Sequence, residues 1–325
     1  MQIFWNPEQD PAYNLALEET MLRRLRGPAL MLWRNGPSVI IGRNQSTMAE
    51  VDCEAVRTLK IPVVRRMTGG GAVYHDTGNL NYSCFADHSG DSFARFDIFA
   101  EPVMAALRTF GIRSEFTGRN DILVDGKKVS GTAKMFVGDR VLFHGTLLFR
   151  TDIATLTRVL TPDPDKVSFK GIRSVSARVG NLGDYLPELS PSEFTGRMLQ
   201  ALLELHGMSS PDPLPEDCIR EARSLADSKY RTWEWNFGSS PAYDYRKRSR
   251  FSGGSVTLEL SISRGRINSA RITGDFFGVR PVSELEALLK NVEFRPSAVR
   301  NALASVVMED FMLGVSPEDF LSLFS

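Results

Sequence analysis

Two arginines and three glycines stand close together in the first quarter of the chain, in the stretch Arg65-Arg66-Met67-Thr68-Gly69-Gly70-Gly71-Ala72-Val73-Tyr74-His75-Asp76. Glycine has no Cβ, so a turn built from it can reach positive φ and let a ligand approach the backbone. The exposed N–H groups of such a turn form a concave anion site, and arginine adds a fixed charge with a planar fork. The pattern predicts a phosphate or carboxylate site, and the alternative is a tight hairpin that merely needs small residues.

A second group of polar residues surrounds a predicted hairpin, Asp125-Gly126-Lys127-Lys128-Val129-Ser130-Gly131-Thr132-Ala133. Asp-Gly between two strands is a strong hairpin signal. Asn120-Asp121 comes just before this hairpin, and His144-Gly145-Thr146 follows on the next predicted strand. Small and polar residues therefore gather where a plain hairpin would alternate apolar with polar ones. Two ordinary surface lysines on a solvated hairpin are the alternative.

The bulk composition is that of an ordinary soluble globule. The chain has 325 residues, with 42% hydrophobic and 24% charged residues, enough for one large domain or two ordinary ones. Lys and Arg total 39, as do Asp and Glu, so the formal net charge is zero. Bulk electrostatics therefore gives no reason to expect a nucleic-acid partner.

Cysteine and histidine usage argues against a metal or disulfide framework. Three cysteines occur far apart, and none forms a Cys-x-x-Cys pair; they are Cys53, Cys84 and Cys218. Four histidines show no metal-ligand spacing; they are His75, His88, His144 and His206. The N-terminus lacks the basic start and long apolar core of a signal peptide, and no apolar run approaches the roughly 20 residues of a membrane helix. We expect a cytoplasmic protein.

Hydrophobic periodicity predicts helices and short strands along the first two thirds of the chain. The predicted helices cover residues 11–26, about 48–59, 99–110, 152–160 and 192–206. The predicted strands cover residues 29–33, 38–41, 63–64, 79–85, 121–124, 127–131 and 141–149.

The last quarter of the chain is predicted to be a separate α/β domain. Gly238-Ser239-Ser240-Pro241 and the basic run Arg246–Arg250 indicate a boundary, so we expect domains at residues 1–245 and 246–325. We interpret the basic run as a solvated hinge surface rather than a binding patch. Beyond it, the alternation from Val256 to Ile262 predicts a half-buried strand, and apolar repeats beginning at Leu285 and at Val299 predict helices.

Taken together, these motifs resemble the lipoate–protein ligase A and lipoyltransferase family. Five segments carry the resemblance, in family order: Trp33-Arg34-Asn35 with Val39–Gln45; Arg65–Asn79; Gly118-Arg119-Asn120-Asp121 with Lys128–Ala133; Phe143–Leu148; and Trp233–Gly238. Any one of them alone is weak, but their joint occurrence is specific.

The resemblance implies a fold and a two-step reaction. The fold is α+β and shared with biotin protein ligases: a mixed, largely antiparallel sheet flanked by helices, followed by a small C-terminal accessory domain. ATP and lipoate give enzyme-bound lipoyl-AMP and pyrophosphate. The lipoyl group then passes to a lysine of an acceptor domain in 2-oxoacid dehydrogenases or the glycine-cleavage H protein. Free lipoate or octanoate is the small-molecule substrate, and we expect a monomer without membrane or nucleic-acid partners.

The resemblance also implies roles for individual residues. Lys128 matches the catalytic lysine that bridges the lipoate carboxylate and the α-phosphate. Substrate and nucleotide contacts fall on Arg66, Gly70, Gly71, Ala72, Val73, Tyr74, Gly78, Asp121, Lys128 and His144. Leu15, Leu17 and Trp33 are candidates for the wall of a lipoyl pocket, and Asp121 for a ligand of the Mg²⁺ that accompanies ATP. Because successive strand residues point to opposite faces, only one of Lys127 and Lys128 can face the site.

Four other functions stay open at this point. A transferase of the same fold could work without ATP through a thioester on Cys84, although its apolar strand neighbours suggest a buried structural thiol. Another transferase could use ready-made lipoyl-AMP. A noncatalytic lipoate or nucleotide sensor would be expected to lose the lysine or the glycines. A biotin ligase would carry Gly-Arg-Gly rather than Gly-Gly-Gly-Ala.

Overall fold

The computed structural model describes residues 1–45, 47–87, 97–117, 120–160, 179–237, 245–263, 265–294 and 296–324. The chain forms two compact units. The first unit comprises Met1–Ile40, Val51–Arg65 and Val73–Asn236, and the second comprises Ile41–Glu50, Arg66–Ala72 and Phe237–Ser325. The glycine motif therefore belongs to the same unit as the C-terminal region, which is far from it in sequence.

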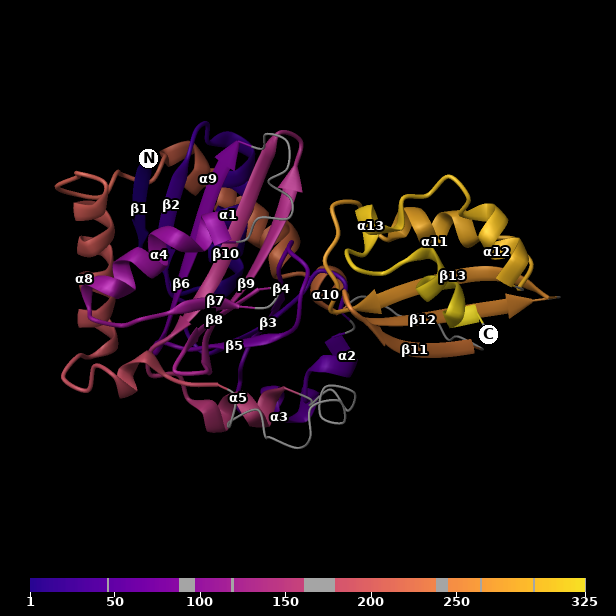
Figure 1. Cartoon of the computed structure of the whole chain (residues 1–325), viewed down its shortest axis with the longest axis horizontal. Helices are drawn as coiled ribbons and strands as arrows, with labels where there is room; N and C mark the ends of the chain where they lie inside the picture. Colours follow the sequence, from indigo (N-terminus) through magenta and orange to yellow (C-terminus); the bar gives the residue numbers. More distant parts are fainter. Residues whose placement is uncertain are drawn as a thin grey trace. The chain divides into compact units, whose positions relative to one another are not determined.

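The described part of the first unit is built on a seven-stranded sheet, ordered β1-β2-β6-β10-β9-β8-β7 (Figure 1). β1 and β2 run parallel, and every other neighbouring pair is antiparallel. The strands are β1 (Gln2–Asn6), β2 (Ala29–Trp33), β6 (Asn79–Asp87), β7 (Glu115–Thr117), β8 (Asp121–Val124), β9 (Lys127–Val137) and β10 (Arg140–Leu148). A smaller sheet has the order β4-β3-β5 and contains β3 (Ser38–Ile41), β4 (Val63–Arg65) and β5 (Val73–His75).

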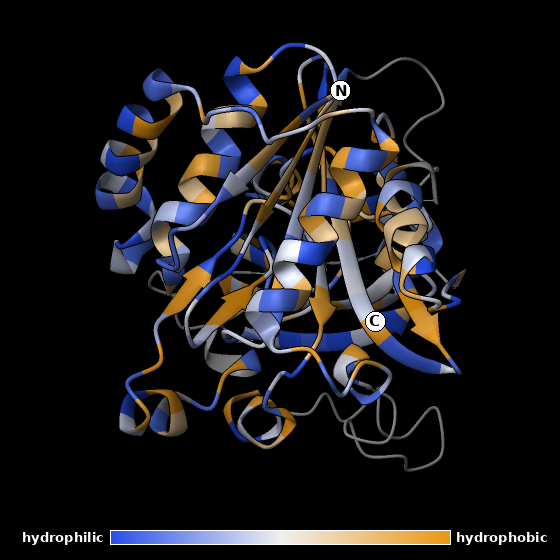
Figure 2. Ribbon diagram, turned by 90° about the vertical axis from the view of Figure 1, so that its left-hand side faces the viewer, coloured by the Kyte–Doolittle hydropathy of each residue, from blue (hydrophilic) through white to orange (hydrophobic). Residues whose placement is uncertain are grey.

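The helices of the first unit are α1 (Pro11–Arg24), α3 (Cys53–Thr58), α4 (Asp97–Thr109), α5 (Ile153–Val159), α8 (Pro191–Leu205), α9 (Glu216–Leu225) and α10 (Trp233–Asn236), with short turns η2 (Leu182–Asp184) and the π-helical η3 (Ala226–Tyr230). Among them, α1, α4 and α8 pack on the large sheet, while α5 and α10 contact the small one. Hydrophilic and hydrophobic residues alternate along these helices in Figure 2, as in amphipathic helices that pack on a sheet.

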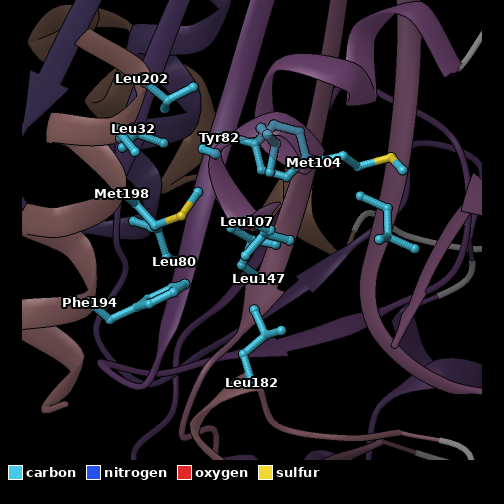
Figure 3. Packing of buried hydrophobic residues seen from close by; sticks show 14 of the residues in the cluster. Leu32, Leu80, Tyr82, Met104, Leu107, Leu147, Leu182, Phe194, Met198 and Leu202 are labelled. Atoms are coloured by element: carbon cyan, nitrogen blue, oxygen red, sulfur yellow. The ribbon is translucent and has the colours of Figure 1, made fainter. Parts of the chain in front are cut away.

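One face of the large sheet forms the main hydrophobic core. Leu80, Tyr82 and Leu147 of the sheet pack there with Phe194 and Met198 of α8, as Figure 3 shows. Because side chains alternate along a strand, the residues of β6 between these core residues point to the other face. Those residues are polar: Asn79, Asn81 and Ser83. The sheet thus separates the main apolar core from a second face that carries these polar residues among apolar ones; it is called the polar face below.

The second unit carries its own core and a three-stranded antiparallel sheet. Its strands are β11 (Tyr245–Phe251), β12 (Gly254–Ser263) and β13 (Arg266–Gly274). Its helices are α2 (Thr47–Glu50), α11 (Ser283–Leu289), α12 (Pro296–Ala302), α13 (Met308–Phe311) and α14 (Pro317–Leu321), followed by η4 (Ser322–Phe324). Burial of β12 residues such as Leu258 and Leu260 against Phe276 and Phe311 closes this core.

The fold prediction is confirmed at the level of class and architecture, and three local predictions are corrected. The helix predicted over residues 48–59 is two helices, since Asp52 accepts the Ala55 N–H and caps α3. The helical repeat beginning at Val299 ends at Ala302. The basic run Arg246–Arg250 is not a hinge surface, because β11 pairs along its length with β12.

The boundary predicted at residue 245 stays a prediction. Gly238–Pro241, one of the two segments on which it was based, lies outside the described residues.

Candidate active site

Five residues from neighbouring strands form a row across the polar face of the large sheet. Trp33 of β2 pairs with Asn81 of β6, and Asn81 pairs with Thr146 of β10. The Gly131 N–H of β9 donates to Thr146 Oγ1 at 3.3 Å, and Gly131 pairs with Asp121 of β8. Directly opposed residues of a sheet share a face. The row therefore brings the predicted residues Trp33 and Asp121 onto one surface.

A β-bulge adds the predicted catalytic lysine to this row. Ile122 pairs with Ser130, but Leu123 pairs with Lys128, so Val129 is an extra residue on β9. In a regular strand Lys128 and Gly131 would point to opposite faces, because three positions separate them. The extra residue restores them to the same face, and bulges are known to re-aim side chains in this way.

The ammonium group of Lys128 lies over Gly131 and against Asp121. Its Nζ is 2.7 Å from Asp121 Oδ1, and both side chains are 36% exposed. A Cβ at position 131 would come within 3.1 Å of this Nζ, so glycine leaves room for the ammonium. Lys127 is exposed and its side chain lies against Gly180 instead. The two lysines thus have different surroundings, as the strand alternation predicts.

A buried polar network lies on the same face of the sheet. Glu18 of α1 accepts a hydrogen bond from Ser83 Oγ at 2.5 Å, and Ser83 in turn accepts from Trp33 Nε1 at 2.7 Å. His144 Nδ1 lies 2.9 Å from Glu18 Oε1 and 3.2 Å from Oε2. The tautomer of His144 that carries its proton on Nδ1 can donate to this carboxylate. These four side chains, all buried, hold the predicted residues Trp33 and His144 in fixed orientations.

Sequence reasoning missed Glu18 and Ser83. The signal for Ser83 was present in β6, where Asn79, Asn81 and Ser83 alternate with apolar residues. Glu18 gave no comparable signal, because a glutamate on a helix is most often a surface residue.

Within the described part of the chain, two buried atoms of the asparagine pair in β6 have no hydrogen-bond partner. Asn79 Nδ2 donates to Asn81 Oδ1 at 2.8 Å, while Asn79 Oδ1 and Asn81 Nδ2 find no partner among the described residues. Each unsatisfied buried group typically costs about 1–3 kcal/mol. One acceptor and one donor are therefore available to a polar ligand at the row.

The two leucines predicted for a lipoyl pocket are both buried in α1. Leu15 is three residues before Glu18 and lies on the same side of the helix. Leu17 is rotated by about 100° from Glu18. The helix geometry thus favours Leu15 over Leu17 as a neighbour of the buried network.

The glycine turn of the second unit encloses the guanidinium of Arg66. Arg66 is 6% exposed, and its Nε donates to Thr68 Oγ1 at 2.9 Å. Its Nη2 donates to the carbonyl oxygens of Gly69 and Gly71 at 2.7 and 2.8 Å. The Arg66 guanidinium therefore fixes the shape of the turn and also supplies a positive charge.

The turn is tight around Gly70, where a Cβ would lie 3.0 Å from the Phe277 ring and 3.1 Å from Arg66 Nη2. Gly70 has φ +90°, a conformation that favours glycine. Its carbonyl oxygen approaches Gly42 so closely that a Cβ at position 42 would lie 2.0 Å from it. Gly71 and Ala72 follow and are half-buried.

The motif then re-enters the first unit at Val73 and Tyr74 in β5. Burial raises the pKa of Tyr74 to about 12, with Asp76 and Asp152 adding to the effect, so its hydroxyl is neutral at physiological pH. Gly78 is buried against the main chain, since a Cβ there would lie 2.1 Å from the Arg150 carbonyl oxygen.

Strand β4, which leads into the glycine turn, is tied to α10. The Arg65 N–H donates to Asn236 Oδ1 at 2.8 Å, and Arg65 Nε donates to the Trp235 carbonyl at 2.9 Å. Trp235 Nε1 donates back to the Arg65 carbonyl at 2.8 Å. The Lys229 ammonium lies 4.1 Å from the centre of the Trp235 ring and 2.6 Å from the buried Glu19 carboxylate.

Comparison with known proteins assigns the chain to a family. A family model described as the lipoyl protein ligase A/B catalytic domain matches residues 10–203. The chain belongs to the lipoyl protein ligase A/B family. A model of the bacterial lipoate protein ligase C-terminus matches residues 240–324. Lipoate-protein ligase LplJ of Bacillus subtilis is 38% identical over 319 residues, which cover 97% of this chain and 96% of LplJ.

Three solved structures are similar to this one. P. falciparum LipL1 in complex with lipoate matches at a TM-score of 0.80 and 23% identity, over 99% of this chain and 97% of LipL1, which supports the fold. The second is from a structural analysis of a bi-partite lipoate protein ligase and its E2 lipoyl domain from Thermoplasma acidophilum. It matches at a TM-score of 0.65 and 30% sequence identity, over 75% of this chain and 98% of that one. A lipoate-protein ligase A bound with ATP matches at a TM-score of 0.64 and 30% sequence identity. The match covers 73% of this chain and 98% of that ligase.

The predicted family and the predicted enzyme class, a lipoate–protein ligase, are confirmed by these relatives. The roles of the individual site residues stay predictions. Gly118, Arg119 and Gly238 of the matched segments lie outside the described residues, as does His88. Among the described residues, no helix is long and apolar enough to cross a membrane.

Proposed function

We propose that this protein activates lipoate with ATP at the row around Lys128 and transfers the lipoyl group to a lysine of a lipoyl acceptor domain. One observation carries the proposal: the Lys128 ammonium shares a sheet face with the buried Trp33–Ser83–Glu18–His144 network. The ammonium can neutralise phosphate and carboxylate, and the network fixes the orientations of Trp33 and His144 on the same face. The relative with bound ATP and the lipoate ligase LplJ support the same assignment.

In the first step a lipoate carboxylate oxygen attacks the α-phosphorus of ATP. The bond to the β-phosphate bridging oxygen breaks, and pyrophosphate leaves with that electron pair. Two negative groups must approach one another, so cations already in place lower the barrier. Lys128 leaves Asp121 to bridge the carboxylate and the phosphate, and Arg66 with the N–H groups of Gly71 to Tyr74 supports the nucleotide.

In the second step the acceptor lysine attacks the acyl carbon of lipoyl-AMP. The bond from that carbon to the phosphate oxygen breaks, AMP leaves, and the amine loses a proton. An ordinary lysine has a pKa near 10.4 and is mostly protonated at neutral pH. AMP is a good leaving group when its phosphate charge is stabilised, and Lys128 is the cation of the row that would stabilise it.

Mg²⁺ belongs to this chemistry as a partner of the ATP phosphates, whose charge it neutralises. Asp121 is the carboxylate of the row that would hold it, once Lys128 has moved to the ligand. No cluster of three or more His, Cys, Asp or Glu side chains suited to a metal occurs among the residues that the structure describes. This fits an ion that is held mainly by the substrate, with one carboxylate from the protein.

The acceptors are lipoyl domains of 2-oxoacid dehydrogenases or the glycine-cleavage H protein, and the enzyme acts as a monomer in the cytoplasm. The Thermoplasma relative, determined with its E2 lipoyl domain, supports this class of acceptor. The free thiols Cys84 and Cys218 are compatible with a reducing compartment.

A thioester mechanism on Cys84 is not favoured. Cys84 is 6% exposed in the main core, and burial raises the pKa of its thiol to about 12. A nucleophilic cysteine needs the opposite, a lowered pKa in an accessible and electropositive setting.

Mass spectrometry of a lipoyl acceptor domain tests the proposal. The domain is incubated with the protein, ATP, Mg²⁺ and lipoate, and with each component omitted in turn. We expect the mass of one lipoyl group only in the complete mixture, with pyrophosphate released. Modification without ATP would contradict the proposal, as would failure to modify any acceptor while lipoyl-AMP does not form.

A further inference from the structure

The glycine turn is packed against Phe276 and Phe277, which follow β13 more than 200 residues later in the chain. A Cβ at Gly69 would lie 2.6 Å from the Phe276 carbonyl oxygen and 3.2 Å from Phe277 Cα. A Cβ at Gly70 would lie 3.0 Å from Cζ of the Phe277 ring. Two of the three glycines are therefore in close contact with this segment, all within the second unit.

The same ring lies beside the side chain that shapes the turn. The position of a Cβ at Gly70 is 3.0 Å from Phe277 Cζ on one side and 3.1 Å from Arg66 Nη2 on the other. That Nη2 donates to the carbonyls of Gly69 and Gly71. Movement of the ring would thus free Gly70 to move, and with it the carbonyl groups that orient the Arg66 guanidinium.

Core packing and main-chain hydrogen bonds fix the position of Phe277. Phe276, its neighbour, is completely buried in the core of the second unit. The Phe277 carbonyl accepts the Leu313 N–H at 2.8 Å, and the Gly274 N–H donates to the Asn44 carbonyl at 2.6 Å. Phe277 itself is 5% exposed. The ring therefore presents a fixed surface to the turn.

We propose that Phe277 is a positioning residue for adenylate formation, which acts by holding Gly70 and, through the turn, the guanidinium of Arg66. The inference rests on the proposed function, since it assigns Arg66 and the turn to the nucleotide. It explains why a ligand-binding turn needs glycine at positions 69 and 70, where the close neighbours are protein atoms.

The first experiment compares Phe277→Ala with Phe324→Ala. Both phenylalanines are buried in the second unit, at 5% and 4% exposure, but Phe324 packs on Phe294 and Phe320 rather than on the turn. The readouts are the KM for ATP and the kcat of lipoate-dependent ATP–pyrophosphate exchange, measured below the melting temperature of each variant. A displaced turn can cost on the order of 10²-fold in rate. We expect a loss of this size in kcat/KM for Phe277→Ala, a small loss for Phe324→Ala, and recovery in Phe277→Tyr.

The second experiment is a pair of double-mutant cycles. The methyl group of Gly70→Ala meets the end of the Phe277 ring, so Phe277→Ala should relieve part of its effect, although the positive φ remains unfavourable. The methyl group of Gly69→Ala meets the Phe276 carbonyl, which Phe277→Ala leaves in place. We expect strong coupling in the first cycle and little in the second.

Equal losses in Phe277→Ala and Phe324→Ala, with additive behaviour in both cycles, would overturn the positioning role. Failure of the proposed function is distinguishable, because the wild-type protein would then show no lipoate-dependent pyrophosphate exchange at all. An active wild type with a Phe277→Ala variant that loses only melting temperature would refute the inference and leave the function intact.

Discussion

The two cations assigned to the reaction are held in different ways, each within its own unit of the molecule. Lys128 stands on a strand of the first unit, is 36% exposed and pairs with a single carboxylate, Asp121. Arg66 belongs to a turn of the second unit, is 6% exposed and donates to carbonyl groups of that turn. An ammonium on a flexible stem can exchange one partner for another, whereas a guanidinium with its donors already used has a structural role as well. We therefore expect Lys128 variants to lose chemistry alone and Arg66 variants to lose the shape of the site too.

Replacing the guanidinium is the most severe test of this contrast. In Arg66→Lys the charge stays, but a single ammonium cannot reach Thr68, Gly69 and Gly71 with the geometry of the fork. We expect a loss of about 10²–10³-fold in pyrophosphate exchange. The melting temperature should also fall, because buried carbonyl groups lose donors. Wild-type activity in this variant would show that charge alone suffices at position 66.

A small change beside the lysine should reduce activity without changing stability. In Gly131→Ala the new methyl group would meet the end of the Lys128 side chain at 3.1 Å, and this flexible end can move away. We expect an exchange rate lowered by about 10- to 100-fold and an unchanged melting temperature. Gly196→Ala is the control, since no atom of the described residues outside its own helix lies within 4 Å of a Cβ there. Full activity in Gly131→Ala would mean that the position of the ammonium is not critical.

The stability contributed by Glu19, whose partner Lys229 packs on Trp235 beside Arg65, should depend on pH. Burial of Glu19 acts to raise its pKa, but Lys229, Tyr230 and Arg23 outweigh burial and hold the pKa below its usual value of 4.5. A carboxylate whose pKa is lower in the folded than in the unfolded protein stabilises the fold when the pH is above its pKa in the unfolded chain. This stabilisation is lost as the pH falls through its pKa in the folded protein. We expect Glu19→Gln to lower the free energy of unfolding by about 1–3 kcal/mol at pH 7.

Below pH 4.5 the difference in the free energy of unfolding between wild type and Glu19→Gln should become smaller. Chemical denaturation from pH 7 to pH 3 measures it, with Glu193→Gln as a control, because that carboxylate also has a lowered pKa but only caps α8. A difference that is constant over this range would contradict the assigned ionisation of Glu19.

The smallest effect is expected at the cysteine of the main core. Cys84 Sγ contacts the Phe99 carbonyl at 3.6 Å and its thiol stays protonated at neutral pH. We expect Cys84→Ala to keep lipoyl transfer within about twofold of wild type while losing some stability through a small cavity. Complete loss of transfer with intact pyrophosphate exchange would instead favour a thioester intermediate.

Much of the fold could be predicted from the sequence because the signals were local. The Asp125-Gly126 turn has positive φ at both residues, as the Asp-Gly pair predicted, and α1 begins after the capping side chain of Asp10. The bulge at Val129 was not predictable in this way, since β-branched residues are ordinary in strands and the extra residue is visible only in the pairing with β8.

The site was predictable where residue types are unusual and not where they are buried among apolar neighbours. Lys128 and Arg66 stood out beside glycines, and the structure gives each a defined environment. Glu18 did not stand out, because its role comes from Ser83 and His144, which lie on strands far along the chain. The contact of Gly69 and Gly70 with Phe277 is likewise a product of tertiary packing, which no local pattern encodes.

The most direct test of the central claim compares the two neighbouring lysines of β9. Lys128→Ala and Lys127→Ala are purified side by side, and lipoate-dependent ATP–pyrophosphate exchange is measured for each. Because Lys128 alone lies over the row with Asp121 and Gly131, we predict a loss of about 10²–10³-fold in Lys128→Ala and near wild-type exchange in Lys127→Ala. Equal activity of the two variants would contradict the account.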